Sequence, residues 1–240
     1  MTNAEQFLDH YSAIERYLRR TYGSKNIHDT FLQLITKAEI HHSVIAYYAN
    51  DLREYGELRN AIVHKYAPQE NSIIAEPHSF VVERMAHIRK MIEDPLKIKD
   101  VMVKSIKVAD INDSIYDVAI NMYKNIYTHV PVYEDKNFIG VLSESSLLRW
   151  TGYQAKLGVA LSTTNKISQM KKFLDVAGNK FNDFEFVPNN TLILDVRDKF
   201  EKALYEGRRL GVVFATKTGK NTEYIEGLLT AWDLPKLKLK

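Results

Sequence analysis

The sequence predicts an α+β protein, in which an all-α helical bundle is followed by two copies of a mixed strand–helix unit. Apolar residues recur at helical spacing up to about position 95, and short β-branched runs then alternate with helical patches. This alternation occurs twice, which indicates an internal repeat. We therefore expect a helical bundle at 1–95, a first mixed unit at 96–152, a linker or helical segment at 153–182 and a second mixed unit at 183–240.

The composition excludes several classes of protein. With 240 residues, 45% hydrophobic and 26% charged, the chain is long enough for two folded domains, and its net charge of +3 is too balanced to indicate nucleic-acid binding by an overall field. The absence of cysteine excludes disulfides and thiolate chemistry. The histidines lack metal-ligand spacing, and no apolar run approaches the roughly 18 residues of a membrane span. We expect a cytoplasmic protein with no metal site and no membrane partner.

Four helices are expected in the first part. Thr2 and Glu5 form a capping box ahead of an apolar stripe that ends near Gly23, and a second apolar set follows Asp29. A third and longest helix covers 44–62, because that run has helical spacing and no interior proline. The fourth helix ends before a proline at position 95.

The second part repeats three short motifs in the same order, and a turn-rich insertion lengthens the last hairpin of the second copy. Each copy is read as strand, helix, strand, hairpin turn, strand and helix. The matching segments are 115–118 and 193–196, 131–133 and 212–214, and 140–143 and 227–230.

The ordered motifs from Ile98 to Ser143 resemble a CBS domain, and residues 183–236 resemble its degenerate partner. The resemblance implies a CBS pair, or Bateman module, that senses a ligand in the clefts between its two domains. It implies an adenine nucleotide (AMP, ADP or ATP) or S-adenosylmethionine as the regulatory ligand, and no required cofactor.

Five residues are expected to bind the nucleotide. The second copy contains Thr230 and Asp233 in the family's Gly-x-x-Thr-x-x-Asp motif, in which the carboxylate accepts hydrogen bonds from ribose hydroxyls. Arg208 and Arg209 are the expected phosphate partners. In the first copy Ser143 keeps the hydroxyl, but a serine stands three residues later in place of the aspartate. We therefore expect at most one strong site.

Each of these assignments has a plainer alternative. Asp233 is also suited to capping the N-terminus of the final helix, and the two roles are compatible. Arg208 and Arg209 are equally well explained as a solvated charged pair.

The first part carries a second resemblance. The segment from Arg59 to Tyr66 is similar to the Arg-x4-His-x-Tyr signature of HEPN domains, especially the HepT-like toxins. That resemblance implies a metal-independent ribonuclease that acts on RNA as a homodimer. It also implies that Tyr66 is a target for inactivating modification, although simple packing explains this tyrosine as well.

The residue types suit such chemistry. His64 can move the 2′-hydroxyl proton while the guanidinium of Arg59 stabilises the charged phosphorane, and Asn60 lies on the same helix face as His64. Arg59 and His64 are separated by about 140° around the helix, so a two-fold dimer is needed to bring both types together. In the plainer alternative, Arg59 pairs with Glu54 or Glu57. Asn60 and His64 then cap the helix end and satisfy its backbone groups.

Two functions remain open from the sequence. In the first, an adenine-nucleotide sensor controls a dimeric, HEPN-like ribonuclease. In the second, the chain is a non-catalytic CBS sensor, and its helical domain serves dimerisation or partner binding.

Overall fold

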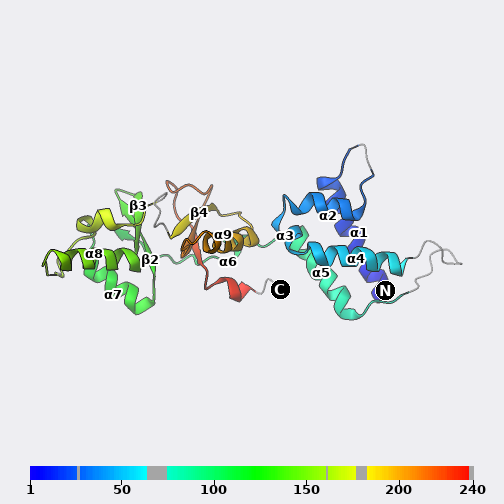
Figure 1. Cartoon of the computed structure of the whole chain (residues 1–240), viewed down its shortest axis with the longest axis horizontal. Helices are drawn as coiled ribbons and strands as arrows, with labels where there is room; N and C mark the ends of the chain where they lie inside the picture. Colours follow the sequence, from blue (N-terminus) through cyan, green and yellow to red (C-terminus); the bar gives the residue numbers. More distant parts are fainter. Residues whose placement is uncertain (26–27, 64–74, 161, 177–182, 238–240) are drawn as a thin grey trace. The chain divides into compact units, whose positions relative to one another are not determined.

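The computed structural model describes residues 1–25, 28–63, 75–160, 162–176 and 183–237 (Figure 1). The chain divides into two units, Met1–Leu96 and Lys97–Lys240. The first contains helices and the second contains both helices and strands, which confirms the α+β class. Within the described ranges, no helix combines the length and the apolar character that a membrane span requires.

Amphipathic helices build the first unit. The capping box predicted for Thr2 and Glu5 is present, and a second box at Thr30 and Gln33 starts the next helix. The first helix packs on the second, fourth and fifth, and its apolar stripe is buried. The helices in the described part of this unit are α1 (Asn3–Tyr22), α2 (Phe31–Glu39), α3 (Ser43–Tyr47), α4 (Ala49–Ile62) and α5 (Ser79–Glu93).

The prediction of one continuous helix over 44–62 was wrong, because the chain leaves helical geometry at Tyr48 (φ −100°, ψ 11°). The buried Tyr48 side chain hydrogen-bonds through its hydroxyl to His87 Nε2 at 3.1 Å, and the guanidinium of Arg84 lies over its ring. Contacts with α5 therefore hold this tyrosine at a break that no proline or glycine marks.

Two three-stranded sheets with the same connectivity form the second unit. In each sheet the first strand pairs parallel with the second, and the second pairs antiparallel with the third. The elements of the first copy are α6 (Ile98–Val101), β1 (Ala109–Asp110), α7 (Ile115–Asn125), β2 (His129–Glu134), β3 (Asn137–Ser143) and α8 (Glu144–Lys156). Those that follow are the 3-10 helix η1 (Ile167–Phe173), β4 (Phe184–Pro188), α9 (Ile193–Tyr205), β5 (Val212–Thr216), β6 (Gly227–Thr230) and the 3-10 helix η2 (Leu234–Leu237).

The first sheet buries both of its faces. Val130, Val132 and Leu142 pack with the helices α7, α8 and η1 in one core. On the other side, Val141 and Phe138 join the phenylalanines of the second sheet and Val212 in a separate core. The two copies therefore depend on each other to exclude water from their strands.

Short crossed bridges also link the copies. Val103, which precedes β1, pairs antiparallel with Leu228 of β6, and Asp175, which precedes β4, pairs antiparallel with Val141 of β3. Each sheet thus receives the segment that leads into the other copy.

Replacing Gly140 by alanine is expected to destabilise the second unit by about 1–3 kcal/mol, the usual cost of overpacking. A Cβ at this position would lie 2.8 Å from the Asp175 carbonyl oxygen and 3.1 Å from Leu174 Cβ, so the crossed bridge would have to move. Urea denaturation measures the change. Gly152→Ala is the control, because Gly152 lies in α8 with open space around it and alanine favours a helix. Equal stability of the two variants would contradict the tight fit at Gly140.

Candidate functional site

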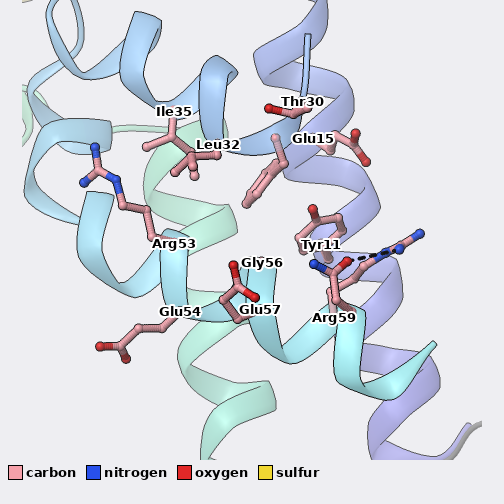
Figure 2. Close-up of a pocket in the computed structure, with 12 residues that line it drawn as sticks. Tyr11, Glu15, Thr30, Leu32, Ile35, Arg53, Glu54, Gly56, Glu57 and Arg59 are labelled. Atoms are coloured by element: carbon pink, nitrogen blue, oxygen red, sulfur yellow. Dashed lines mark hydrogen bonds between the residues drawn. The ribbon is translucent and has the colours of Figure 1, made fainter. Parts of the chain in front are cut away.

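A pocket of about 560 Å³ lies between α1, α2 and α4 in the helical unit (Figure 2). Gly56 lets the Phe31 ring approach α4 closely at this pocket, because a Cβ there would lie 3.3 Å from that ring. Two residues singled out in the sequence, Arg59 and Asn60, line this pocket. Its other lining residues are Tyr11, Glu15, Thr30, Phe31, Leu32, Ile35, Arg53, Glu54, Gly56 and Glu57.

Arg59 lies beside a tyrosine, and no acid among the described residues forms an ion pair with it. Its Cζ atom lies 5.9 Å from the centre of the Tyr11 ring, and its Nη1 donates a 3.4 Å hydrogen bond to Asn60 Oδ1. Neither Glu54 nor Glu57 forms an ion pair with it, so the plainer alternative for Arg59 is not observed. Burial raises the pKa of Tyr11 to about 12, so its hydroxyl stays protonated at neutral pH.

The charges of this pocket are mixed. Arg53 is occupied by Glu39, with Nη2 at 2.7 and 2.8 Å from the two carboxylate oxygens. Glu15 accepts a hydrogen bond from Arg19 at 2.8 Å, outside the pocket. Among the described residues that line the pocket, the guanidinium of Arg59 is therefore the cation without an acidic partner, although Glu54 and Glu57 line the same pocket. His64 and Tyr66, the other residues of the motif, lie outside the described residues.

The second candidate site is the end of β6. Asp233 Oδ2 accepts hydrogen bonds from the backbone N–H of Thr230 at 3.0 Å and from its hydroxyl at 2.7 Å. Both side chains are half-buried. The structure thus brings together the hydroxyl and the carboxylate that the sequence motif pairs. Asp233 reaches back to the end of the strand, as the third residue of a capping box does.

The two arginines differ in their surroundings. Arg208 donates from Nε to Glu206 at 2.9 Å and from Nη2 to Glu185 at 3.4 Å, whereas Arg209 is exposed. Because Val212 pairs with Thr230, the residues that precede β5 lie at the same end of the sheet as Thr230. Arg209 is therefore the better placed of the two for a phosphate, and Arg208 is already bound to acids.

In the first copy the matching position is filled by the protein itself. The hydroxyl of Ser143 donates to Asp175 Oδ2, and Arg149 Nη2 donates to Asp175 Oδ1 at 2.5 Å. The Asp175 side chain is only 1% exposed. Ser146, which replaces the motif's aspartate, is buried and hydrogen-bonds to Ser143.

The same hydroxyl–carboxylate pair therefore ends the third strand of both copies. In the second copy the carboxylate comes from three residues along the chain, and in the first it comes from the linker, 32 residues away. Sequence reasoning missed Asp175 and Arg149, because a contact of such long range leaves no local spacing to read. It also missed Tyr11, for which the one signal was a polar aromatic residue within an apolar stripe.

Comparison with known proteins identifies part of the chain. Residues 98–152 match the family model of the CBS domain, which confirms the prediction of a CBS domain in the first copy. The second copy lies outside the matched segment, so its membership of the family stays a prediction. The HEPN-like character of the helical unit stays a prediction as well. No curated protein matches this chain.

Similar solved structures contain CBS domains. One is the CBS domain pair of protein MJ0100 in complex with 5′-methylthioadenosine and S-adenosyl-L-methionine (14% identity, 60% of this chain and 95% of that chain, TM-score 0.42). Another is a hemolysin-like protein containing a CBS domain from Oenococcus oeni PSU (19%, 64% and 98%, TM-score 0.41). A third is CBSX2 in complex with AMP (16%, 60% and 96%, TM-score 0.43).

Among the described residues there is no cluster of three or more His, Asp or Glu side chains placed to hold a metal ion.

Proposed function

We propose that the second unit is a regulatory module that binds one adenine nucleotide, or S-adenosylmethionine, at the end of β6. The observation that carries this proposal is the half-buried pair of Thr230 and Asp233, which joins a hydroxyl to a carboxylate at the motif position. A carboxylate there accepts hydrogen bonds from both ribose hydroxyls, and exposed Arg209 lies at the same end of the sheet for the phosphate.

The first copy does not offer a second equivalent site. Both oxygens of Asp175 are engaged, one by Ser143 and one by Arg149, and the group is buried. A ribose would have to break a charge-assisted pair to enter, and a phosphate would meet a buried carboxylate. The Ser143 hydroxyl, predicted as a ligand contact, thus serves the linker in this state.

Calorimetric titration of the full chain with AMP, ADP, ATP and S-adenosylmethionine tests both points. We expect saturable binding of at least one compound, with one molecule bound per chain. Two molecules per chain would contradict the expectation of a single site, and the absence of binding by all four would overturn the proposed sensor function.

The proposed effector is the helical unit, acting as a metal-independent ribonuclease under control of the bound nucleotide. Its support is the pocket that Arg59 and Asn60 line, in which Arg59 is free of the acids that the plainer alternative assigned to it. His64 would supply the proton transfer, as the motif implies. The alternative function, a non-catalytic sensor whose helical domain dimerises or binds a partner, predicts intact RNA under every nucleotide condition.

The proposed function requires a homodimer, and outward apolar side chains on the first copy are suited to form one. Tyr123 of α7 is 87% exposed and Leu148 of α8 is 73% exposed, so both side chains are accessible to a second copy of the chain. Sedimentation should give a mass near twice the 27.8 kDa of one chain. Tyr123→Arg should shift the distribution toward the monomer, whereas Lys202→Ala on α9 should not. A monomeric wild-type chain at micromolar concentration would contradict the dimer.

A further inference from the structure

A second cleft of about 600 Å³ opens in the CBS-containing unit, at the hairpin end of the two sheets. This volume falls in the range of small-molecule sites. Three segments enclose the cleft: the run leading into and forming β1, the β2–β3 hairpin, and the end of the loop before β6. Its lining residues are Lys104, Ile106, Val108, Ala109, Asp110, Tyr133, Lys136, Phe138, Asn221, Thr222, Glu223, Tyr224 and Ile225.

This cleft is separate from the Thr230–Asp233 position. Ile225 and Thr230 lie five residues apart along β6 and its approach, which corresponds to roughly 16 Å of extended chain. Neither Thr230 nor Asp233 lines the cleft.

Apolar and aromatic side chains make up its walls. The rings of Tyr133 and Phe138 meet edge to face, with centroids 6.0 Å apart. Tyr224 and Val108 are exposed although both line the cleft, so apolar surface there remains in contact with water. A ligand with a flat apolar body would cover that surface and gain the corresponding hydrophobic free energy.

The two acids that line the cleft, Asp110 and Glu223, accept hydrogen bonds from neighbouring donors. Asp110 Oδ1 accepts hydrogen bonds from the backbone and side-chain amides of Asn112 at 2.9 and 3.1 Å. Glu223 accepts from the backbone N–H and the hydroxyl of Thr218 at 2.6 and 2.7 Å, and these bonds lower the pKa of Glu223 to about 2. Both oxygens of Glu223 and one oxygen of Asp110 are therefore engaged by neighbouring groups.

The two lysines that line the cleft differ from the acids, because the described neighbouring side chains do not neutralise them. Neither Lys104 nor Lys136 takes part in an ion pair within the described part of the chain. Lys136 also sits in the left-handed region (φ 67°), next to Asp135 (φ 49°), in the two-residue turn between Glu134 and Asn137. A two-residue hairpin turn of this type requires positive φ at both central residues, so the turn fixes the backbone of Lys136 at the border of the cleft.

We propose that this cleft binds a small organic anion with a flat apolar body, such as an aromatic carboxylate or sulfonate. The ring system lies against Tyr133, Phe138 and Val108, and the anionic group pairs with Lys104 and Lys136. The second unit then binds two regulatory ligands, because this anion and the nucleotide occupy different sites.

Fluorescence titration of the full chain with 1-anilinonaphthalene-8-sulfonate, a flat apolar anion, tests the proposal. We expect saturable binding of one probe per chain. Val108→Trp should abolish binding by filling the cleft, whereas Val103→Trp should not, because Val103 is equally exposed (44% against 46%) and lies outside it. Lys104→Ala combined with Lys136→Ala should weaken binding about tenfold to a hundredfold, the scale of lost charged hydrogen bonds. Lys217→Ala, outside the cleft on the β5–β6 hairpin, should leave it unchanged.

Excess AMP should not displace the probe. Displacement by AMP would show that the cleft is a nucleotide site, and unsaturable binding or full binding by Val108→Trp would show that the probe binds elsewhere; each result overturns the proposal. AMP binding by Val108→Trp is measured separately, because it reports on the proposed nucleotide site and not on the cleft. The two measurements therefore distinguish failure of this inference from failure of the sensor function.

Discussion

RNA cleavage by the chain should fall about 10²–10³-fold when Arg59 is replaced by alanine, the usual loss when a preorganised donor to a developing oxyanion is removed. Of the two arginines that line the described part of the helical pocket, Arg59 is the one without an acidic partner, because Arg53 is held by Glu39. His64→Ala should reduce the rate about 10²–10⁴-fold, as expected for a lost general acid or base. The assay follows labelled single-stranded RNA in EDTA, with the matching DNA expected to remain uncut.

The control is Arg20→Ala, which removes an exposed guanidinium from α1 without touching the pocket. Its rate should equal that of the wild type. Thermal melting checks that Arg59→Ala is folded, since that side chain also lies beside the buried Tyr11. A wild-type rate for Arg59→Ala would assign the activity to another site or to a contaminant. Intact RNA with the wild-type chain under every nucleotide condition would leave dimerisation or partner binding as the helical unit's role.

Coupling between the two units has its own signature in the same assay. A nucleotide that binds the two effector states with different affinities must change the cleavage rate, and one that binds them equally must not. If the chain cleaves RNA at the same rate with and without bound nucleotide, both sites are functional but the proposed coupling between them is contradicted.

Local signals in the sequence were sufficient to predict much of this fold. The capping box at Thr2, the helical spacing behind it and the twofold recurrence of short motifs rest on neighbouring residues, and the structure contains all three. The helix break at Tyr48 is a feature that such local signals do not predict. Nothing within a few residues marks the helix break there, because His87 and Arg84 hold the tyrosine from another helix.

The candidate site also contains one contact that local spacing predicts and one that it does not. The pairing of Thr230 with Asp233 follows from their three-residue spacing, and the structure contains it. The filling of the first copy by Asp175 does not follow from any spacing, since the linker has to fold back onto β3 before the carboxylate meets Ser143. Loss of the motif's aspartate at position 146 predicted a weaker first site, but not that the linker would supply a carboxylate in its place.

Nucleotide binding should weaken by about 1–3 kcal/mol in Asp233→Ala, which is roughly a fivefold to 150-fold rise in Kd. The expected cause is the loss of charged hydrogen bonds to the ribose hydroxyls. Asp233 also holds the end of β6, so alanine disturbs the local fold as well. Asp233→Asn separates the two roles, because its amide oxygen still accepts from Thr230 while the negative charge is gone.

We therefore expect Asp233→Asn to melt close to the wild type and still bind nucleotide more weakly, as measured by calorimetry. Asp198→Ala is the matched control, since Asp198 is an exposed acid on α9 paired with Arg197. Unchanged affinity in both Asp233 variants would show that this carboxylate is only a cap. If nucleotide affinity falls only in Asp233→Ala, and that variant also melts at a lower temperature, Asp233 is again a structural cap and not a ribose ligand. Weakened binding by Asp233→Asn at unchanged stability is the result that assigns the ribose to Asp233, because charge is then the property that has been removed.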